Sequence, residues 1–258
     1  MQWLAIGEGQ IPAGRGWLTD AECTRADSMR FTKRRTEYLL RRLAGKRAVA
    51  AAVGFPADPT SLRRVGVLNR PTGAPFVQVD GGDLGLDVSL TDRAGAAVCL
   101  VGPDLGAVGC DLEVVESRSE GFVRDFLTPA EQHVVTSMPD LDSRDAAANL
   151  IWSAKESALK VLRTGLRADT RTVEVVIEDP QGLGTDQAGS DSSRWRSLTV
   201  RTVKGPFPGW WRRDGVFLIT VAASAGLGAP PRVLPGSADL STMEPLHSWV
   251  ERPLTDWT

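Results

Sequence analysis

One pattern limits the folds open to this chain: a long, proline-free helical stretch that precedes a set of short strands, occurring twice. Residues 33–53 lack proline and are rich in good helix formers, which predicts a long helix. Residues 142–163 predict a second helix, because their apolar side chains recur every three or four positions. After a Pro/Gly turn region at residues 70–75, the first set of strands, which resembles a meander, is predicted at 86–90, 97–101 and 107–115. The second set is predicted at 172–177, 197–203 and 216–222, with Asp214-Gly215 as a tight turn.

A weak internal repeat accompanies this pattern. The segment 127–131 resembles the segment 18–22, and we call the separation between these two segments the repeat offset. The same offset carries Lys46 in the first long helix onto Lys155 in the second. These matches are short, but they suggest two similar halves around a pseudo-two-fold axis, with a site between them.

The predicted fold class is therefore α/β (α+β), with each half a long helix packed on a small antiparallel sheet. We expect an N-terminal half at 1–104, a C-terminal half at 105–225, and a Pro/Gly-rich tail of unknown role at 226–258. The tail and residues 179–193 are expected to be loosely ordered, and the tail to be dispensable for chemistry.

Composition excludes several classes of protein. With 258 residues, 42% of them hydrophobic, the chain can bury a substantial core, and its net charge of -2 gives no general attraction to nucleic acid or membrane. No apolar run is long enough to span a bilayer. The three cysteines lack metal-ligand spacing, which favours reduced thiols in a soluble, cytoplasmic protein.

The first long helix carries an excess of basic side chains. Between residues 33 and 47 its acidic side chain is Glu37, and Arg35, Arg42 and Lys46 recur along one side. That side could hold an anion. A solvated basic face is the alternative, and composition favours it.

Two carboxylates share one face of a predicted strand. In the segment 108–115, the period of two places Asp111 and Glu113 together. Their mutual repulsion must be relieved by water or by a cation, and Mg²⁺ accepts oxygen ligands from one or two carboxylates while binding substrate phosphates. The alternative is a solvent-facing strand end.

A third acid favours the metal site. Trp152, Glu156 and Lys160 share a face of the second helix, with Lys155 next to it. An acid that completes a metal site, flanked by two cations, suits a reaction at phosphorus. An ordinary surface pair between Glu156 and Lys160 remains the alternative.

Glu131 fits a helix cap rather than a catalytic base on sequence grounds. Thr128, Pro129 and Glu131 form a capping box, with Thr128 as the N-cap. Neither His133 nor His247 forms a constellation with Ser or Cys that would indicate a nucleophilic triad.

Two of these motifs together resemble the signature of the 4'-phosphopantetheinyl transferases. They are Gly109-Cys110-Asp111-Leu112-Glu113 and, some forty residues later, Trp152-Ser153-Ala154-Lys155-Glu156-Ser157-Ala158. The match is closest to the large, monomeric type that activates non-ribosomal peptide and polyketide synthases, and it extends from about Lys33 to Ala222. The family's two similar α/β halves agree with the internal repeat.

The resemblance implies transfer of the phosphopantetheine arm of coenzyme A onto a serine of a carrier protein, with release of adenosine 3',5'-bisphosphate. It implies that Asp111, Glu113 and Glu156 hold Mg²⁺. Lys155 and Lys160 would then offset charge on the leaving phosphate. Glu131 falls where the family is thought to keep a carboxylate that helps to deprotonate the serine, so it becomes a candidate base as well as a cap.

In the first half, the resemblance implies a set of residues that bind coenzyme A. The set comprises Arg34, Arg42, Arg70, Gly73, Thr91 and Asp92. Two positions depart from the family pattern: Asp92 stands in place of a histidine, and Ala74 in place of a lysine. An acid beside a phosphate is unfavourable unless it turns away or is neutralised by an arginine such as Arg93.

Carrier recognition is expected from residues 116–127. Phe122, Phe126 and Leu127 could pack on the carrier, while Arg118 and Arg124 meet its acidic residues. Aromatic core packing is the alternative for Phe126. Two rival functions remain: a non-catalytic relative that binds a carrier or nucleotide, and a different magnesium-dependent phosphoryl-transfer enzyme, which is disfavoured because no P-loop pattern occurs.

Overall fold

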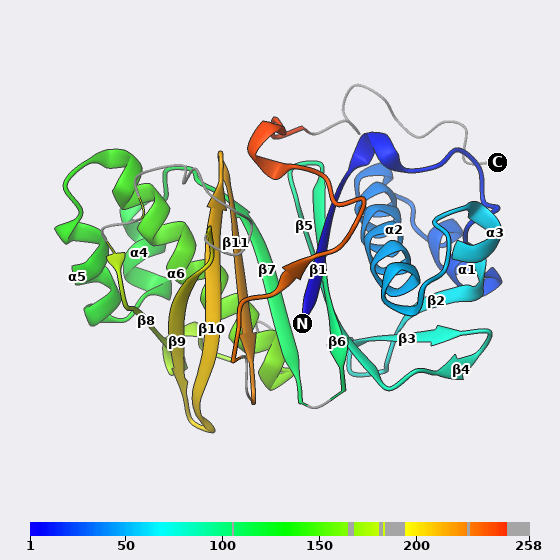
Figure 1. Ribbon diagram of the computed structural model, residues 1–258. Coiled ribbons are helices and arrows are strands. Elements are labelled where there is room, and N and C mark those ends of the chain that lie inside the picture. The colour runs from blue at the N-terminus through cyan, green and yellow to red at the C-terminus, as the bar shows by residue number, and fades with distance from the viewer. Residues whose placement is uncertain (105, 165–167, 181–182, 184–193, 226–227, 247–258) are drawn as a thin grey trace. The chain divides into compact units, whose positions relative to one another are not determined.

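The computed structural model describes residues 1–104, 106–164, 168–180, 183, 194–225 and 228–246. These residues form a mixed α/β structure with two compact units (Figure 1). Unit 1 contains Met1–Asp104, Arg232–Asp239 and, among the described residues, 243–246. Unit 2 contains Leu105–Pro231 and Leu240–Thr242.

Unit 1 is built around one long helix. Its helices are α1 (Asp20–Asp27), α2 (Thr32–Val53) and α3 (Pro59–Arg64). Its strands are β1 (Gln2–Gly7), β2 (Val65–Asn69), β3 (Pro75–Val79), β4 (Gly82–Asp83), β5 (Leu86–Arg93), β6 (Ala96–Pro103) and β12 (Arg232–Val233). They form one sheet in the order β12-β1-β6-β5 and another in the order β2-β3-β4.

The apolar face of α2 forms the core of unit 1. Leu39, Leu43 and Ala44 are fully buried, and the helix packs against β1, β5 and β6. Gly54 ends the helix in the left-handed region, with φ of 77°, a conformation that glycine adopts without strain.

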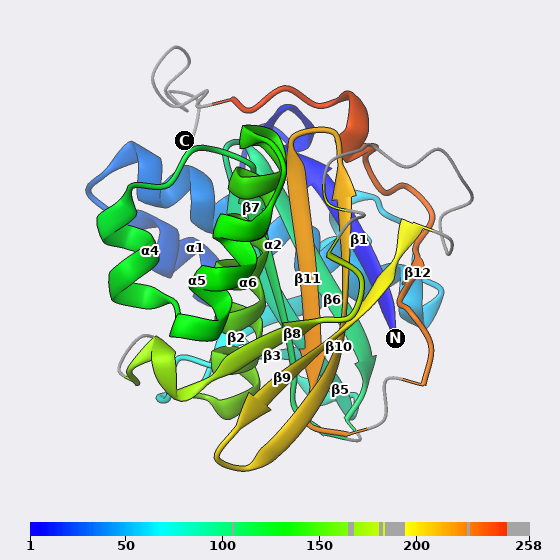
Figure 2. The same ribbon diagram turned by 90° about the vertical axis from the view of Figure 1, so that its left-hand side faces the viewer.

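Unit 2 combines three α-helices with a single antiparallel sheet. Its helices are α4 (Glu120–Phe126), α5 (Pro129–Ser137) and α6 (Leu141–Leu162). Its strands are β7 (Val108–Val114), β8 (Glu174–Ile177), β9 (Arg196–Thr202), β10 (Gly205–Asp214) and β11 (Phe217–Ala223). The sheet order is β7-β11-β10-β9-β8, and α6 packs on β7 and β11 (Figure 2).

The structure confirms both long helices and the six strands that the sequence predicts, with ends shifted by a few residues. The meander is wrong, because β7 does not continue the sheet of β5 and β6: it pairs with β11, which lies much further along the chain. The tight turn at Gly215 is confirmed, since it joins β10 to β11 with Asp214 opposite Phe217. The sequence analysis did not predict β1 to β4, β10, β12 or the short helices α3 and α4, whereas the capping box at Thr128 predicts the start of α5.

Both units follow the same order of elements. A first strand, a short capped helix and a long helix precede the remaining strands in each: β1, α1 and α2 in unit 1, and β7, α5 and α6 in unit 2. The first strand pairs in both cases with the last main strand, β6 or β11, and that strand pairs with the one before it. The pseudo-two-fold axis between the halves stays a prediction.

The tail is shared between the units. Residues 232–239 belong to unit 1, where β12 runs parallel to β1, and Leu240–Thr242 belongs to unit 2. Residues 184–193, within the segment expected to be loosely ordered, and 247–258 lie outside the described residues. Among the described helices, none combines the length and apolar character needed to cross a membrane.

Candidate active site

Asp111 and Glu113 lie on the face of β7 that packs against α6. The hydroxyl of Ser153 donates to Asp111 Oδ2 at 3.0 Å, and Lys160 Nζ lies 2.9 Å from Asp111 Oδ1. The indole of Trp152 donates from Nε1 to Glu113 Oε1 at 3.1 Å. The side chains of α6 therefore contact both carboxylates, as the period of two in the strand predicts.

Gly109 explains how α6 comes so close to β7. A Cβ atom at this position would lie 2.0 Å from the carbonyl oxygen of Ser157, so only a glycine fits. The Ser157 hydroxyl lies 2.8 Å from Thr220 Oγ1, which also lies 2.9 Å from Ser153 Oγ. Since Thr220 on β11 is the register partner of Asp111, these hydroxyls join the helix to the site strands.

Of the three acids predicted to bind the metal, Glu156 has a buried carboxylate oxygen, Oε1, without a hydrogen-bond partner among the described residues. Burial, followed by the nearby Asp111 and then Glu113, raises the pKa of Glu156 to about 7, although Lys160 opposes the shift. A cation placed against this carboxylate would favour the ionised form of Glu156.

The three acids fit a hard cation by their chemistry. All their donors are oxygens, which is the ligand type that Mg²⁺ prefers, and the unsatisfied Oε1 of Glu156 is an atom that such an ion would bind. In the part of the chain that the structure describes, no three acidic, histidine or cysteine side chains converge closely enough to chelate an ion as they stand. Lys160 contacts Asp111, and Arg118 contacts Glu113. Metal binding would therefore require these two cations to move away from the carboxylates.

Arg118 joins the acidic site to a group of aromatic rings. It donates to Glu113 Oε2 at 3.1 Å and to Asn149 Oδ1 at 2.7 Å, and its guanidinium lies over the ring of Phe122 at 4.9 Å. The aromatic cluster comprises Phe122, Phe126 and Trp152, with ring centroids 5.0 to 5.2 Å apart.

In the segment predicted to bind the carrier, residues 116–127, the exposed side chains are not all those that the sequence predicts. Phe126 is 37% exposed and can contact a partner, whereas Leu127 is fully buried in the core of unit 2. The expectation that Leu127 contacts the carrier is therefore wrong. Arg124 is exposed, and its guanidinium lies 3.0 Å from Asp125.

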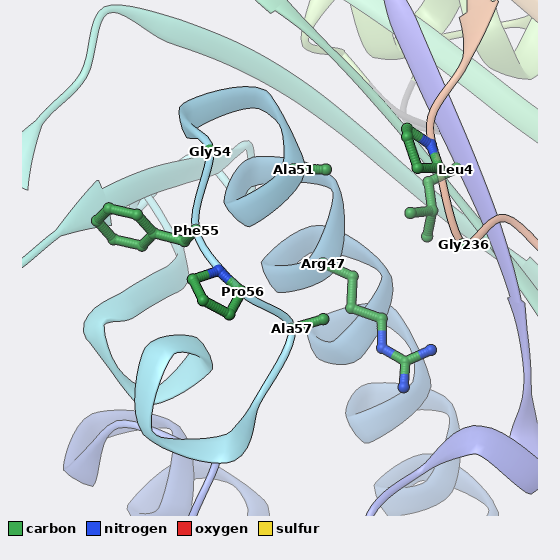
Figure 3. A pocket seen from close by; sticks show the side chains of 9 residues that line it. Leu4, Arg47, Ala51, Gly54, Phe55, Pro56, Ala57 and Gly236 are labelled. Atoms are coloured by element: carbon green, nitrogen blue, oxygen red, sulfur yellow. The ribbon is translucent and has the colours of Figure 1, made fainter.

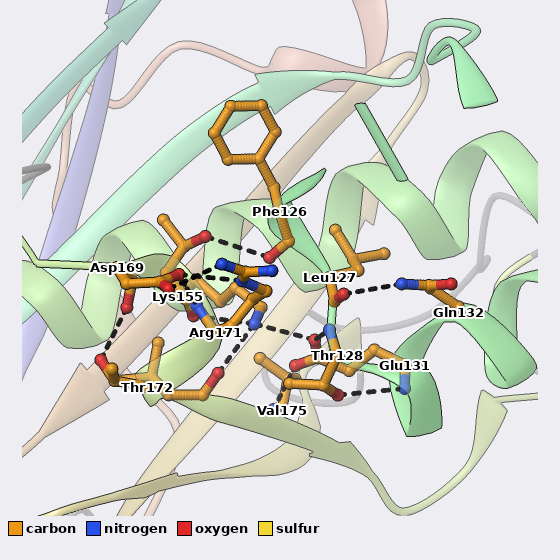
Figure 4. A network of polar contacts seen from close by, with 12 residues as sticks. Phe126, Leu127, Thr128, Glu131, Gln132, Lys155, Asp169, Arg171, Thr172 and Val175 are labelled. Atoms are coloured by element: carbon orange, nitrogen blue, oxygen red, sulfur yellow. Dashed lines mark hydrogen bonds and ion pairs between the residues drawn. The ribbon is translucent and has the colours of Figure 1, made fainter. Parts of the chain in front are cut away.

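Glu131 and Lys155 form a buried ion pair, with Lys155 Nζ 2.8 Å from Glu131 Oε2 (Figure 4). Lys155 also donates to the carbonyl oxygens of Thr170 and Val173, at 2.9 and 2.7 Å. Both oxygens of Glu131 accept backbone N–H groups, from Thr128 and Val175, at 2.7 Å each. Burial lowers the pKa of Lys155, and Glu131 opposes that shift.

This geometry does not agree with the expectation that Glu131 and Lys155 act on the substrate. The side chain of Lys155 is 0% exposed and that of Glu131 is 1% exposed. Their hydrogen-bonding groups are already engaged in joining α6, the start of α5 and β8. The capping box that the sequence predicts is confirmed, with Thr128 as the N-cap of α5.

Unit 1 contains the same pair at the repeat offset. Lys46 Nζ lies 2.7 Å from Glu22 Oε2, and both side chains are 0% exposed. Lys46 donates to the backbone carbonyls of Leu62 in α3 and Val65 at the start of β2. Glu22 accepts from the backbone N–H groups of Thr19 and Val67. Asp111 and Glu113 have no acidic counterparts in unit 1, where the offset leads to Gln2 and Leu4, so the recurrence of the ion pair indicates a structural role.

The residues predicted to bind coenzyme A fall into two groups in unit 1. Arg42 is buried, donates to the carbonyl of Val67 and to Asn69 Oδ1, and lies over the Tyr38 ring. Asn69 in turn donates to the carbonyl of Gly73 at 2.8 Å. Arg42 therefore supports the turn at 70–73 through Asn69.

Arg34 and Arg70 are exposed and can meet a phosphate directly, with Arg70 placed over the Phe76 ring at 4.9 Å. Gly73 occupies the left-handed region, with φ of 91°, which explains a glycine in this turn. Thr91 is buried on β5.

Asp92 forms an ion pair with Arg41 of α2. This ion pair with Arg41 supplies the neutralisation by an arginine that the sequence predicts for Asp92. Glu37 is close by, and its pKa is raised by burial and then by Asp92. The negative charge of Asp92 is therefore offset within unit 1.

Sequence reasoning missed several side chains of the site. Ser153 and Ser157 stand four residues apart inside the helical motif, a spacing that could have indicated a shared face toward β11. The contact of Arg41 with Asp92 links α2 to β5, and no local pattern connects these two elements. Arg118 and Glu113 are five residues apart, but their contact follows no helix or strand period.

Comparison with known proteins identifies the segment that carries this site. No curated protein matches the chain. The family model of the 4'-phosphopantetheinyl transferase superfamily matches residues 107–208, which include Asp111, Glu113 and Glu156. The chain therefore carries a domain of the 4'-phosphopantetheinyl transferase superfamily at residues 107–208.

Proposed function

We propose that the protein transfers the 4'-phosphopantetheine group of coenzyme A to a serine of an acyl or peptidyl carrier protein. The superfamily match supports phosphopantetheine transfer in general. The observation that carries the proposal further is the unsatisfied Oε1 of Glu156 beside Asp111 and Glu113, a set of oxygen donors suited to a cation on a pyrophosphate.

In this proposal, the serine Oγ forms a bond to the phosphorus that carries the pantetheine arm. The bond from that phosphorus to the bridging oxygen breaks, and adenosine 3',5'-bisphosphate leaves. Water accepts the serine proton, because Glu131 is buried and its oxygens are engaged. Bound Mg²⁺, held by Asp111, Glu113 and Glu156, would neutralise charge on the pyrophosphate.

The protein's own cations orient the rest of the substrate. Burial acts to lower the pKa of the half-buried Lys160, but Asp111 and the other nearby acidic groups outweigh burial and raise it, so Lys160 stays charged beside the phosphate. Arg34, Arg70 and the turn at Gly73 would bind the nucleotide phosphates. Arg42 positions that turn.

The carrier would dock on the aromatic cluster and on Arg124. Phe126 offers exposed apolar surface to a carrier helix. Arg124 can break its ion pair with Asp125 and pair with an acidic residue of the carrier instead. We further propose that the protein acts as a monomer in the cytoplasm and serves non-ribosomal peptide or polyketide synthases.

A mass-shift assay tests the proposal. The protein is incubated with coenzyme A, MgCl₂ and several apo carrier domains, and intact-mass spectrometry follows the gain of one phosphopantetheine arm. Asp111→Ala and Glu156→Ala should abolish turnover with the folded structure retained. Glu244→Ala, which removes an exposed carboxylate of unit 1, serves as the matched control.

Two results would contradict the proposal. Modification of none of the carriers would argue for a non-catalytic relative, and calorimetry would then detect carrier binding without dependence on coenzyme A or magnesium. Near-normal turnover in both acidic variants would refute the metal assignment alone.

A further inference from the structure

Unit 1 contains a cavity of about 540 Å³ between the C-terminal half of α2, the loop that follows it, β1 and the tail. Figure 3 shows Arg47, Ala51 and Ala57 projecting toward the side where Leu4 and Gly236 lie. The volume falls within the range of small-molecule sites, about 300 to 1,000 Å³. The lining residues are Leu4, Arg47, Ala51, Gly54, Phe55, Pro56, Ala57, Pro235 and Gly236.

The tail forms a fixed wall of this cavity. Leu234 N–H donates to the carbonyl of Trp3 at 2.8 Å, and Ala238 N–H donates to the carbonyl of Ala5 at 2.8 Å. Ala5 N–H donates in turn to Ser237 Oγ at 2.9 Å. Pro235 and Gly236 lie between these anchors, so the wall is held along β1.

Among the described residues that line the cavity, Arg47 is the one with a charged side chain. Its Nε is buried without a hydrogen-bond partner, and the described residues offer its guanidinium no carboxylate. Burial lowers its pKa. A buried Nε–H group without an acceptor costs free energy, and an anion bound in the cavity could accept from it.

The internal repeat relates this cavity to the acidic site of unit 2. The repeat offset that carries Lys46 onto Lys155 also relates this cavity to the acidic site. It carries Leu4 onto Glu113, Arg47 onto Glu156, and Ala51 onto Lys160. The elements correspond as well, since β1 and α2 match β7 and α6 in order and pairing. An arginine thus stands where the acidic site has Glu156, and its other charged groups are replaced by uncharged residues.

We propose that this cavity binds a small organic monocarboxylate, with the carboxylate on Arg47 and the apolar body against Leu4, Ala51 and Pro235. A single guanidinium matches one carboxylate by two parallel hydrogen bonds. A phosphate dianion would call for a second cation, and the lining residues that the structure describes supply none. The apolar walls require a ligand with a hydrocarbon part.

Isothermal titration calorimetry with octanoate, without coenzyme A or magnesium, tests the site. Octanoate should bind the wild-type protein saturably, and Arg47→Met should weaken it about tenfold or more, because a charge-assisted bond is lost. Ala51→Leu, which fills the cavity, should abolish binding. Arg63→Met and Ala52→Leu, which alter exposed positions on α3 and α2, should bind like the wild type.

Two further probes identify the ligand class. Octan-1-ol should bind weakly and equally to the wild type and to Arg47→Met, and inorganic phosphate should not compete with octanoate. Circular dichroism checks that every variant is folded. Absence of saturable octanoate binding, equal octanoate affinity in Arg47→Met, or competition by phosphate would each overturn the proposal.

Discussion

At the residue scale, Gly109 sets the distance between β7 and α6, and so the position of the acidic site. A Cβ atom there would lie 2.0 Å from the carbonyl oxygen of Ser157 and 3.2 Å from Cβ of Lys160. The first of these is a backbone atom of a long helix, which cannot move away as the end of a flexible side chain could. The glycine of the motif therefore has a packing reason that is independent of catalysis.

Replacing Gly109 with alanine should push α6 away from the sheet. We expect Gly109→Ala to lower the free energy of unfolding by about 1 to 3 kcal/mol, the range for overpacking, and to lower turnover. Urea denaturation measures the first effect and the carrier assay the second. Gly9→Ala is the control, since no atom lies within 4 Å of its Cβ position, and a similar loss there would refute the packing argument.

Glu156 should make the stability of the metal-free protein depend on pH. Burial and then Asp111 raise its pKa from the ordinary 4.5 to about 7, so the folded state holds the proton more tightly than the unfolded chain does. This stabilisation is complete below pH of about 4.5 and is lost as pH rises through about 7. The melting temperature should therefore contain a component that falls across that window.

Glu156→Gln should remove that component, and differential scanning fluorimetry can follow it. Added MgCl₂ should raise the melting temperature of the wild-type protein more at pH 8 than at pH 6, because a deprotonated carboxylate binds the ion. An equal magnesium effect at both pH values would contradict the assignment of Glu156 as a ligand.

At the scale of elements, the buried pairs Glu22–Lys46 and Glu131–Lys155 attach a long helix to a short capped helix and a strand. Each lysine satisfies two backbone carbonyls, and each glutamate caps a helix while accepting a strand N–H. Buried charge is tolerated here because each partner's hydrogen bonds are met. Because the same buried ion pair occurs in both units, we infer that it is a structural feature of the fold.

Lys46→Met and Lys155→Met should therefore destabilise the protein alike. Each leaves a buried glutamate without its partner, which typically costs about 3 to 5 kcal/mol. Urea denaturation measures the loss, and Lys33→Met, at an exposed position on α2, should have little effect. A stable Lys155→Met variant with reduced turnover would instead support direct contact of Lys155 with the substrate.

At the scale of the whole molecule, the tail contributes to both units. Leu234 is 3% exposed in the core of unit 1, and Leu240 is 1% exposed within the segment assigned to unit 2. The expectation that the tail is dispensable does not extend to stability, because residues 232–238 run along β1.

Truncating the buried tail residues should be costly. We expect Leu234→Ala to lower the free energy of unfolding by about 2 to 4 kcal/mol, through lost burial and a new cavity. Leu246→Ala, at a position that is 46% exposed, should change it by less than about 0.5 kcal/mol. Equal effects of the two substitutions in thermal unfolding would show that the tail does not support the core.

Local spacing was enough to predict the elements and the orientation of the site strand. The period of two placed Asp111 and Glu113 on one face of β7, and the helical period placed Trp152 and Lys160 toward them, as their hydrogen bonds confirm. The Thr128 capping box was also predictable. These features depend on residues a few positions apart, whose relative directions follow from backbone geometry.

Only the tertiary structure decided which distant groups meet. It paired β7 with β11 and Asp92 with Arg41, and it buried Glu131 and Lys155 together. Periodicity shows which way a side chain points from its own element but not which element it faces. The sequence by itself therefore determined the two helix-and-sheet halves and the acidic motif, while packing between distant segments decided which charged groups contact each other and which are buried.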